Sequence, residues 1–126
     1  MEKIKTFTDI VAWAEGHKLV IQLYELTKTF PREETFGLTS QIRRAAVSIT
    51  SNIAEGFGRN SFKEKIRFYY ISQGSIIEVK NQLMIARDVK MITGEKFNEI
   101  DAQINHAHRL LQGFISKTKQ LAISSS

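Results

Sequence analysis

Apolar residues recur at three- and four-residue steps along four segments of the chain, which is the spacing of one face of an α-helix. The pattern predicts helices at residues 10–29, 39–56, 61–91 and 95–121. Thr39 and Thr93 are candidate N-caps, and Ser61 with Glu64 has the spacing of a capping box. Pro31 ends the first helix because proline lacks an amide hydrogen and disfavours helix at the residue before it.

The apolar faces of these helices predict the fold class. The first helix has two neighbouring stripes, Ile10, Trp13, Ala14, His17, Val20, Ile21 and Tyr24 in one and Leu19, Leu23, Leu26 and Phe30 in the other. The third helix has an apolar face formed by Phe62, Ile66, Tyr69, Tyr70, Gln73, Ile76, Ile77, Leu83 and Met84. The fourth has a near-heptad seam at Phe97, Ile100, Ile104, Ala107, Leu111, Phe114, Thr118 and Leu121. Amphipathic helices joined by short loops predict an all-α, up-down-up-down four-helix bundle, a single domain over residues 1–126 with a frayed tail at about 122–126.

The second predicted helix carries a polar stripe in addition to its apolar one. Within the run QIRRAAVSITSNIAEG the polar positions are Gln41, Arg44, Ser48, Asn52 and Glu55. Serine and asparagine are poor helix formers, so their place in mid-helix indicates partners in a seam against another helix or subunit. The alternative is a solvated face that happens to hold them. Glu78, about one turn after the small pair Gly74 and Ser75, is a further candidate for this polar network or interface. The small pair itself indicates either close approach of another helix or a local kink.

Positive charge is concentrated in the middle of the chain. The net charge is +5, and residues 41–91 hold nine Lys and Arg against four acidic residues. A localised basic surface favours polyanion partners, and arginine suits phosphate because its planar fork donates two parallel hydrogen bonds. The nucleic-acid-binding candidates are Arg43, Arg44, Arg59, Lys63, Lys65, Arg67, Lys80, Arg87 and Lys90. No sequence-reading motif accompanies them, so we expect backbone-directed binding with weak selectivity.

Catalytic and metal chemistry has little support in the sequence. There is no cysteine, which excludes disulfides, thiol nucleophiles and cysteine-ligated metals and is consistent with a reducing cytoplasm. We expect His17 on the inward side of the first helix, while His106 and His108 are two residues apart and point in different directions. No phosphate loop or di-iron motif is present, so we expect no enzyme, catalytic residue, cofactor or metal. The N-terminal MEKIKTFTDIV has no hydrophobic signal segment, and no apolar run approaches the ~18 residues of a membrane span, which predicts a soluble cytoplasmic protein without a membrane partner.

The run QIRRAAVSITSNIAEG, preceded by Phe30-Pro31 and followed by Gly74, Ser75 and Glu78, resembles a known family. It is similar to the four-helix-bundle proteins first noticed in intervening sequences of bacterial 23S rRNA genes, over about residues 7–121. A related branch resembles the accessory variability protein of diversity-generating retroelements. That resemblance implies a pentameric, ring-like barrel that engages RNA or DNA and a reverse transcriptase, and it implies no settled activity for the intervening-sequence group.

Two functional hypotheses follow. The first is a non-catalytic, self-assembling bundle with a basic surface that binds nucleic acid non-specifically as an accessory module. The second is a structural or protein-interaction module whose positive charge is incidental. The surplus apolar stripe of the first helix and the polar seam of the second predict that these two helices form a subunit interface, and the resemblance points to a homopentamer.

Overall fold

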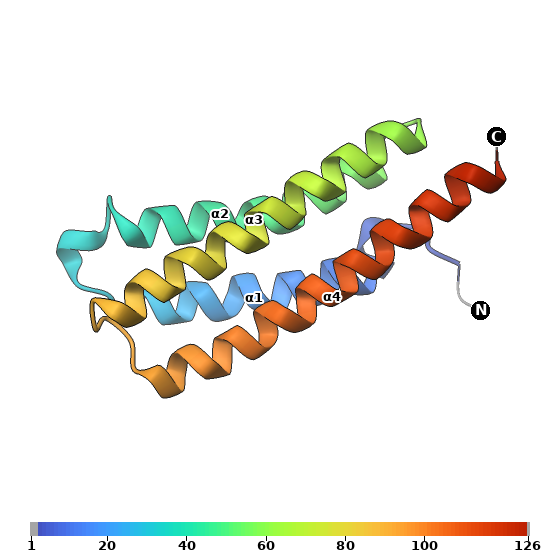
Figure 1. The fold of residues 1–126 in the computed structure, drawn as a ribbon. Helices are drawn as coiled ribbons and strands as arrows, with labels where there is room; N and C mark the ends of the chain where they lie inside the picture. Colours follow the sequence, from blue (N-terminus) through green and yellow to red (C-terminus); the bar gives the residue numbers. More distant parts are fainter. Residues whose placement is uncertain (1–2, 126) are drawn as a thin grey trace.

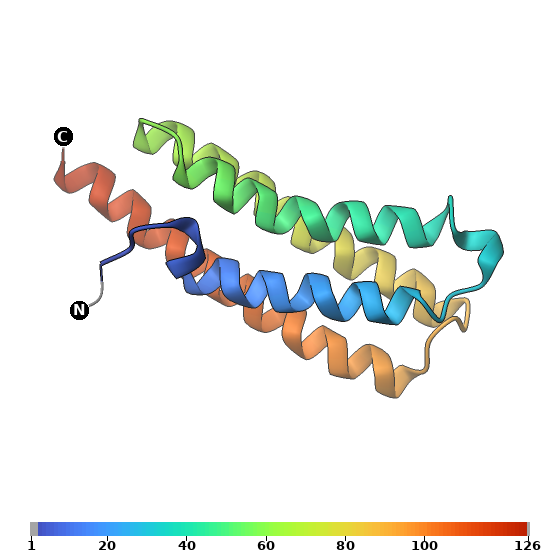
Figure 2. The same ribbon diagram turned by 180° about the vertical axis from the view of Figure 1, so that it is seen from behind.

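Four antiparallel helices form one elongated bundle (Figures 1 and 2). The computed structural model describes residues 3–125, and these contain no strand. The elements in order are the short 3-10 helix η1 (Phe7–Asp9), α1 (Val11–Thr27), the 3-10 helix η2 (Arg32–Glu34), α2 (Leu38–Phe57), α3 (Phe62–Asp88) and α4 (Gly94–Ser124). Each long helix packs against its neighbour in sequence, and α4 closes the bundle against α1. The predicted all-α, up-down-up-down bundle is confirmed.

The helix ends follow local hydrogen-bonding chemistry. Thr93 caps α4 by accepting from the Lys96 amide at 3.0 Å, and the Ser61 hydroxyl accepts from the Glu64 amide at 3.2 Å, as the sequence predicts. Thr39 is not a cap, because α2 begins one residue earlier and the Leu38 amide donates to the Glu34 carboxylate at 3.0 Å.

The observed boundaries differ from the predicted ones by a few residues. Helix α1 stops at Thr27 and α3 at Asp88, both earlier than expected, whereas α4 continues to Ser124 through part of the tail predicted to fray. Ser126 lies outside the described residues. Lys90 adopts a left-handed backbone conformation (φ 67°), and the Met91 amide donates to the Ala86 carbonyl at 2.8 Å, which closes the end of α3.

Each helix buries only part of its apolar surface in the core, so several predicted inward residues lie outside. In and beside α1 the stripe of Leu19, Leu23, Leu26 and Phe30 is buried. Of the other stripe, Ile10 and Val20 are buried, whereas His17 and Ile21 are exposed. The prediction of an inward His17 is therefore wrong, because α1 has only α2 and α4 as long-helix neighbours and cannot bury both stripes. On α4, Ile115 is buried, while Phe114 is half-buried and Leu121 is exposed.

The inner face of α3 is rotated relative to the predicted one. Tyr70, Ile77 and Met84 are exposed. The buried positions are Tyr69, Ser72, Ser75, Ile76, Val79, Gln82, Leu83 and Ala86. Half of these are small or polar, and apolar periodicity alone does not identify them as core.

Small residues bring α2 and α3 close together. The Ser72 hydroxyl donates to the Ile49 carbonyl at 2.7 Å, and the Ser75 hydroxyl donates to that of Ser48 at 2.8 Å. Nothing lies within 4 Å of the place that a Cβ on Gly74 would occupy, so the predicted close approach involves Ser75 and not Gly74. At Gly56 a Cβ would lie 2.7 Å from the Tyr69 ring, so the start of α3 packs directly on the α2 backbone.

Candidate nucleic-acid interface

The turn between α2 and α3 presents three predicted phosphate-binding residues on one exposed corner. Helix α2 ends at Phe57 and α3 begins at Phe62, so Arg59 lies in the turn, while Lys63 and Arg67 lie on the first two turns of α3. The three residues follow one another at four-residue steps. Helical geometry places residues at this spacing on one side of the helix. We name the exposed surface formed by Arg59, Lys63 and Arg67 the basic corner.

The Phe68 ring holds the two arginines of the basic corner in place. The guanidinium carbon of Arg59 lies 4.6 Å from the centroid of this ring, and that of Arg67 lies 4.8 Å from it. Such cation–π contacts fix a long side chain without using its hydrogen-bond donors. Ordering the two guanidinium groups in advance reduces the conformational entropy that phosphate binding would cost.

Ion pairs within the basic corner are exposed and leave donors available. Arg59 lies 3.6 Å from the Glu55 carboxylate, and Arg67 donates to Glu64 at 3.0 Å. Exposed pairs of this kind contribute only about 0.2–1 kcal/mol, and each guanidinium has five N–H donors. Lys63 forms no ion pair within residues 3–125. The corner therefore retains donors for an incoming phosphate.

Two lysines of α4 extend the basic surface, and the sequence analysis did not include them. Residues 109–126 contain Arg109, Lys117 and Lys119 and no acidic residue. Because α3 and α4 are antiparallel, the last turns of α4 lie beside the first turns of α3. Lys119 donates to the Tyr70 hydroxyl across this junction, and Lys117 lines a groove together with Phe62. The sequence signal for these lysines is the absence of acidic residues from 109–126. This signal can be assigned to the end of the bundle with the α2–α3 turn only when the topology is known.

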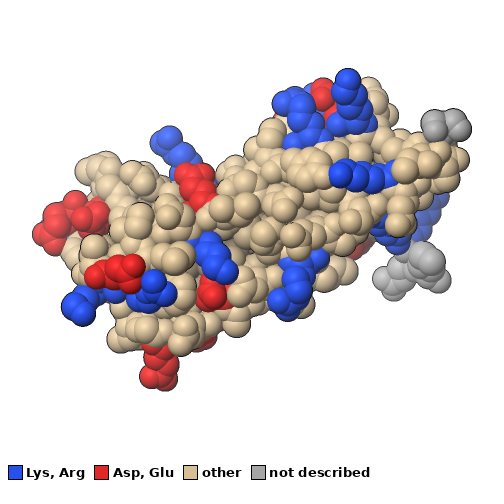
Figure 3. Space-filling model, in the orientation of Figure 1, with Lys and Arg blue, Asp and Glu red and all other residues tan. Residues whose placement is uncertain are grey.

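Charge is distributed unevenly along the long axis of the bundle on the face seen in Figure 3. Lys and Arg gather at the end that carries the α2–α3 turn. Most acidic side chains on this face lie toward the other end, which we name the acidic end, but there they are mixed with Lys and Arg. The α1–α2 connection holds Glu33 and Glu34, and the start of α4 holds Glu95 and Glu99. The net charge of +5 is thus directed toward one end.

The other predicted basic residues lie apart from the basic corner, most of them in contacts of their own. Arg43 donates to the Thr27 hydroxyl at 2.8 Å and lies over Tyr24, which joins α2 to α1. Lys80 donates to Asn105 on α4 at 2.9 Å. Arg87 pairs with Asp88 at 2.8 Å, and Lys90 follows α3 toward the acidic end. Arg44 is exposed in mid-α2 and forms no ion pair among the described residues.

Lys65 is turned into the structure instead of toward solvent. Its ammonium donates to the Phe57 carbonyl at the end of α2, 2.6 Å away, and lies 5.2 Å from the Phe57 ring centroid. Burial lowers the pKa of this ammonium. A cation at the C-terminal end of a helix also favours the helix dipole, so Lys65 ties α3 to α2.

The comparison with protein-family models decides the family. The model described as 23S rRNA-intervening sequence protein matches residues 8–113. This chain belongs to the 23S rRNA-intervening sequence protein family. The resemblance drawn from the run QIRRAAVSITSNIAEG is thereby confirmed. The matched residues include the basic corner and exclude Lys117 and Lys119.

A solved structure has the same fold. It is a crystal structure of a protein with unknown function from the S23 ribosomal protein family of Bacteroides thetaiotaomicron. The two chains superpose with a TM-score of 0.79 at 24% sequence identity, over 86% of this chain and 98% of the other. At that identity the likeness supports the bundle fold alone. No curated protein matches this chain.

The predicted polar network of this 23S rRNA-intervening sequence family member is formed in part. The Asn52 amide donates to the Ser48 hydroxyl at 2.9 Å, which in turn contacts Ser75 of α3, so the seam joins two helices of one subunit. Glu55 pairs with Arg59 and Glu78 accepts from Gln82 at 3.3 Å, in place of the arginines of α2. The side chains of Gln41 and Arg44 are exposed and make no hydrogen bond with described residues.

The histidines do not assemble a metal site. His17 stacks on Trp13 with 4.9 Å between ring centroids, His106 lies 3.6 Å from Glu15, and His108 contacts Gln73 at 3.1 Å. Burial, followed by the charge of Lys80, lowers the pKa of His108. Within residues 3–125 there is no cluster of three or more His, Asp or Glu side chains placed to hold a metal ion. In the same part of the chain, none of the helices combines the length and apolar character needed to cross a membrane.

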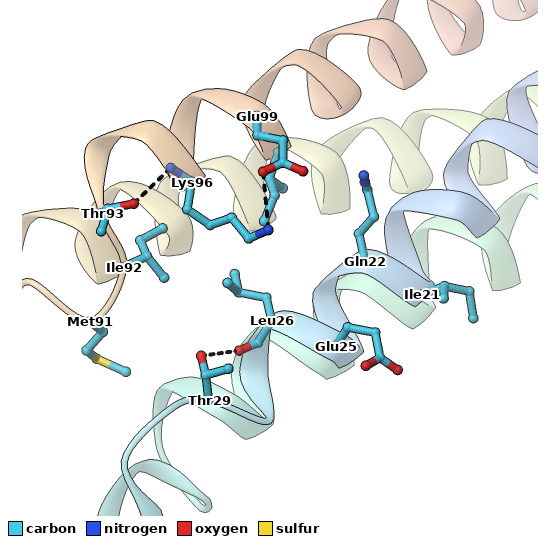
Figure 4. A pocket seen from close by; sticks show the side chains of 11 residues that line it. Ile21, Gln22, Glu25, Leu26, Thr29, Met91, Ile92, Thr93, Lys96 and Glu99 are labelled. Carbon is cyan, nitrogen blue, oxygen red and sulfur yellow. Dashed lines mark hydrogen bonds and ion pairs between the residues drawn. The ribbon is translucent and has the colours of Figure 1, made fainter.

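Two of the grooves lie at opposite ends of the bundle. The larger, of about 610 Å³, lies at the acidic end between α1, the α3–α4 connection and α4 (Figure 4). Its floor is apolar, with Leu26 and Ile92, and Lys96 on its rim is already paired with Glu99 at 3.2 Å. The smaller groove, of about 210 Å³, lies at the basic end, between the start of α3 and the last turns of α4.

Proposed function

We propose that this chain is a non-catalytic, self-assembling helical bundle whose basic end binds the phosphate backbone of nucleic acid. The observation that carries the proposal is the gathering of the basic corner, Lys117 and Lys119 at one end of an otherwise mixed surface. The side chains belong to two antiparallel helices and to the turn between α2 and α3, so the charge is a feature of the fold and not of one basic segment. Hydrogen bonds to phosphates carry no information about the bases, and the chain has no base-reading motif. We therefore expect binding with weak sequence selectivity.

Salt dependence tests the phosphate contacts directly. Fluorescence anisotropy of a labelled single-stranded oligonucleotide should show affinity falling steadily as salt rises, because each neutralised phosphate releases counterions. For three to five contacts, the affinity should drop about 20-fold to 130-fold between roughly 50 and 200 mM salt, from a slope near −0.7 per contact. Strands of different sequence and equal length should bind alike. Absence of binding at the lower salt concentration would favour the alternative, a protein-interaction module whose charge is incidental.

A second observation supports the self-assembly part of the proposal. Helix α3 exposes five large apolar side chains on its outward face, namely Tyr70, Ile71, Ile77, Met84 and Ile85. Tyr70, Ile77 and Met84 recur at seven-residue steps, which places them in one row along the helix. Single apolar residues are normal on a surface, but such a row is typical of a helix that packs against a partner. A ring requires an interface between two different surfaces of neighbouring subunits. We propose that this face of α3 is one of those surfaces, in a ring whose pentameric order is implied by the resemblance to the retroelement branch.

A lysine at position 77 is expected to dissociate the assembly. Ile77 is 55% exposed within one subunit, so Ile77→Lys should leave the fold intact and place a charge in the subunit contact. Ile21→Lys on α1, where the side chain is 51% exposed, is the matched comparison and tests the interface that the sequence predicts on the first two helices. Light scattering on a sizing column should show smaller particles for Ile77→Lys alone. A wild-type protein that is monomeric at tens of micromolar contradicts self-assembly.

A further inference from the structure

Aromatic residues are four of the nine that line the groove of about 210 Å³ at the basic end, and Ile4, Thr118 and Leu121 complete it with two lysines. Phe57 comes from the end of α2, Phe62 and Tyr69 from α3 and Phe114 from α4, with Lys65 and Lys117 beside them. The volume lies below the roughly 300–1,000 Å³ of sites for drug-sized ligands, so it suits a single ring. Aromatic faces next to a cationic surface are the elements with which proteins bind single-stranded nucleic acid.

Tyr69 places an unused polar group at this groove. Its side chain is only 1% exposed, yet it lines the groove, and its hydroxyl makes no hydrogen bond with any of residues 3–125. The hydroxyl oxygen is not among the described polar atoms that are both fully buried and unpartnered, so it remains accessible. Water can therefore satisfy this hydroxyl, and a ligand that displaces the water loses affinity unless it offers an acceptor in its place. Burial also raises the pKa of Tyr69 to about 12, so the hydroxyl stays protonated and able to donate at neutral pH. A ligand with an acceptor on a flat ring would satisfy it.

The two lysines at the groove have different roles. The Lys65 ammonium is engaged by the Phe57 carbonyl at 2.6 Å, so it closes one wall. Lys117 is exposed and forms no ion pair within the described part of the chain, which leaves its charge available at the rim. A ligand that carries an anionic group outside a flat apolar ring matches this arrangement.

We infer that this groove takes one unstacked base of a single-stranded nucleic acid, with the adjoining phosphate on Lys117 and the neighbouring backbone on the basic corner. The inference rests on the proposed function and adds that the site prefers single strands. A base stacked inside a duplex cannot enter, whereas a free base offers a π-face to the aromatic rings and an acceptor to the Tyr69 hydroxyl. An acyl chain or an aliphatic side chain would fill the volume but leave that hydroxyl unpaired.

Two strands with equal phosphates and different bases separate this inference from phosphate binding. One is an oligothymidylate of about 16 nucleotides, and the other is an abasic strand of the same length. The wild-type protein should bind the thymidylate strand about tenfold more tightly, the effect of stacking one base. Tyr69→Phe removes only the hydroxyl and should reduce this preference about fivefold. Phe62→Leu keeps an apolar side chain but loses the aromatic face, and it should reduce the preference as well.

Phe36→Leu is the matched control, because Phe36 is 97% exposed in the connection between α1 and α2, and the base preference should persist in it. Thermal melting should show that all three variants are folded. Equal wild-type affinities for the two strands would overturn the groove inference and leave phosphate binding in place. Loss of binding to both strands would remove the proposed function and the inference with it. Binding of a fluorescent fatty acid that is lost in Phe62→Leu, with no base preference, would assign the groove to acyl chains instead.

Discussion

Replacing Arg59, Lys63 and Arg67 together by glutamine is expected to weaken single-stranded nucleic-acid binding by roughly 10- to 100-fold at about 50 mM salt. The three side chains of the basic corner are exposed, and the ion pairs that Arg59 and Arg67 form are exposed as well. Each side chain can therefore reach a phosphate. Loss of three contacts should flatten the plot of log affinity against log salt by about two units. The effect should be the same for every sequence, since these groups do not read bases.

The triple variant needs a control for total charge. Lys28, Arg32 and Lys96 are exposed at the acidic end, and their replacement by glutamine removes the same charge from the wrong place. The control should lose less than a tenth of the affinity that the triple variant loses. Its charges lie at the far end of the bundle, well beyond the ~10 Å Debye length in 0.1 M salt. The helical circular dichroism of both variants should match the wild type, because exposed ion pairs add little stability. Equal weakening in both variants would indicate a response to net charge and would dismiss the basic corner as the site.

Gly56→Ala is expected to destabilise the bundle by about 1–2 kcal/mol. The new Cβ would lie 2.7 Å from the Tyr69 ring and 2.9 Å from the Cβ of Phe68. Neither neighbour can yield cheaply, because Tyr69 is buried and packs against Phe114 with 4.9 Å between ring centroids. Overpacking of this kind costs about 1–3 kcal/mol, and the better helix propensity of alanine returns up to about 1 kcal/mol.

Gly113→Ala is the matched substitution for Gly56→Ala. Gly113 lies in the interior of α4, and nothing is found within 4 Å of the place that its Cβ would occupy. Alanine there should raise stability by as much as about 1 kcal/mol through helix propensity alone. Urea unfolding followed by circular dichroism measures both changes. An increase in stability for both variants would show that the contact between α2 and the start of α3 is looser than described.

The helices were predictable because their signals are local. Pro31, Ser61 and Thr93 act on residues within one turn of themselves, and all three mark a helix end close to where the sequence placed it. Orientation is not local. Ser72 and Ser75 are buried because α2 approaches closely at Ser48 and Ile49, and no pattern within α3 reveals this.

The candidate site shows the same division between local and tertiary information. Arg59, Lys63 and Arg67 share a surface because they are four residues apart on one local structure, which sequence spacing captures. Arg43 and Lys65 were predicted to bind phosphate for the same reason, their positive charge. Their side chains instead bond to Thr27 and Phe57, which belong to other elements. Lys117 joins the site only because α4 returns to the start of α3, which sequence proximity cannot show.

Positive charge is in excess at the basic end, whereas the acidic end carries both signs, and this asymmetry gives the molecule a permanent electric dipole along its length. In the field of a polyanion such a dipole experiences a torque, so an approaching molecule turns its basic end forward before contact. Prior orientation raises the fraction of productive encounters and so the association rate. Salt shortens the range of this torque to about 8 Å at physiological ionic strength. The association rate should therefore depend on ionic strength more strongly than the dissociation rate does.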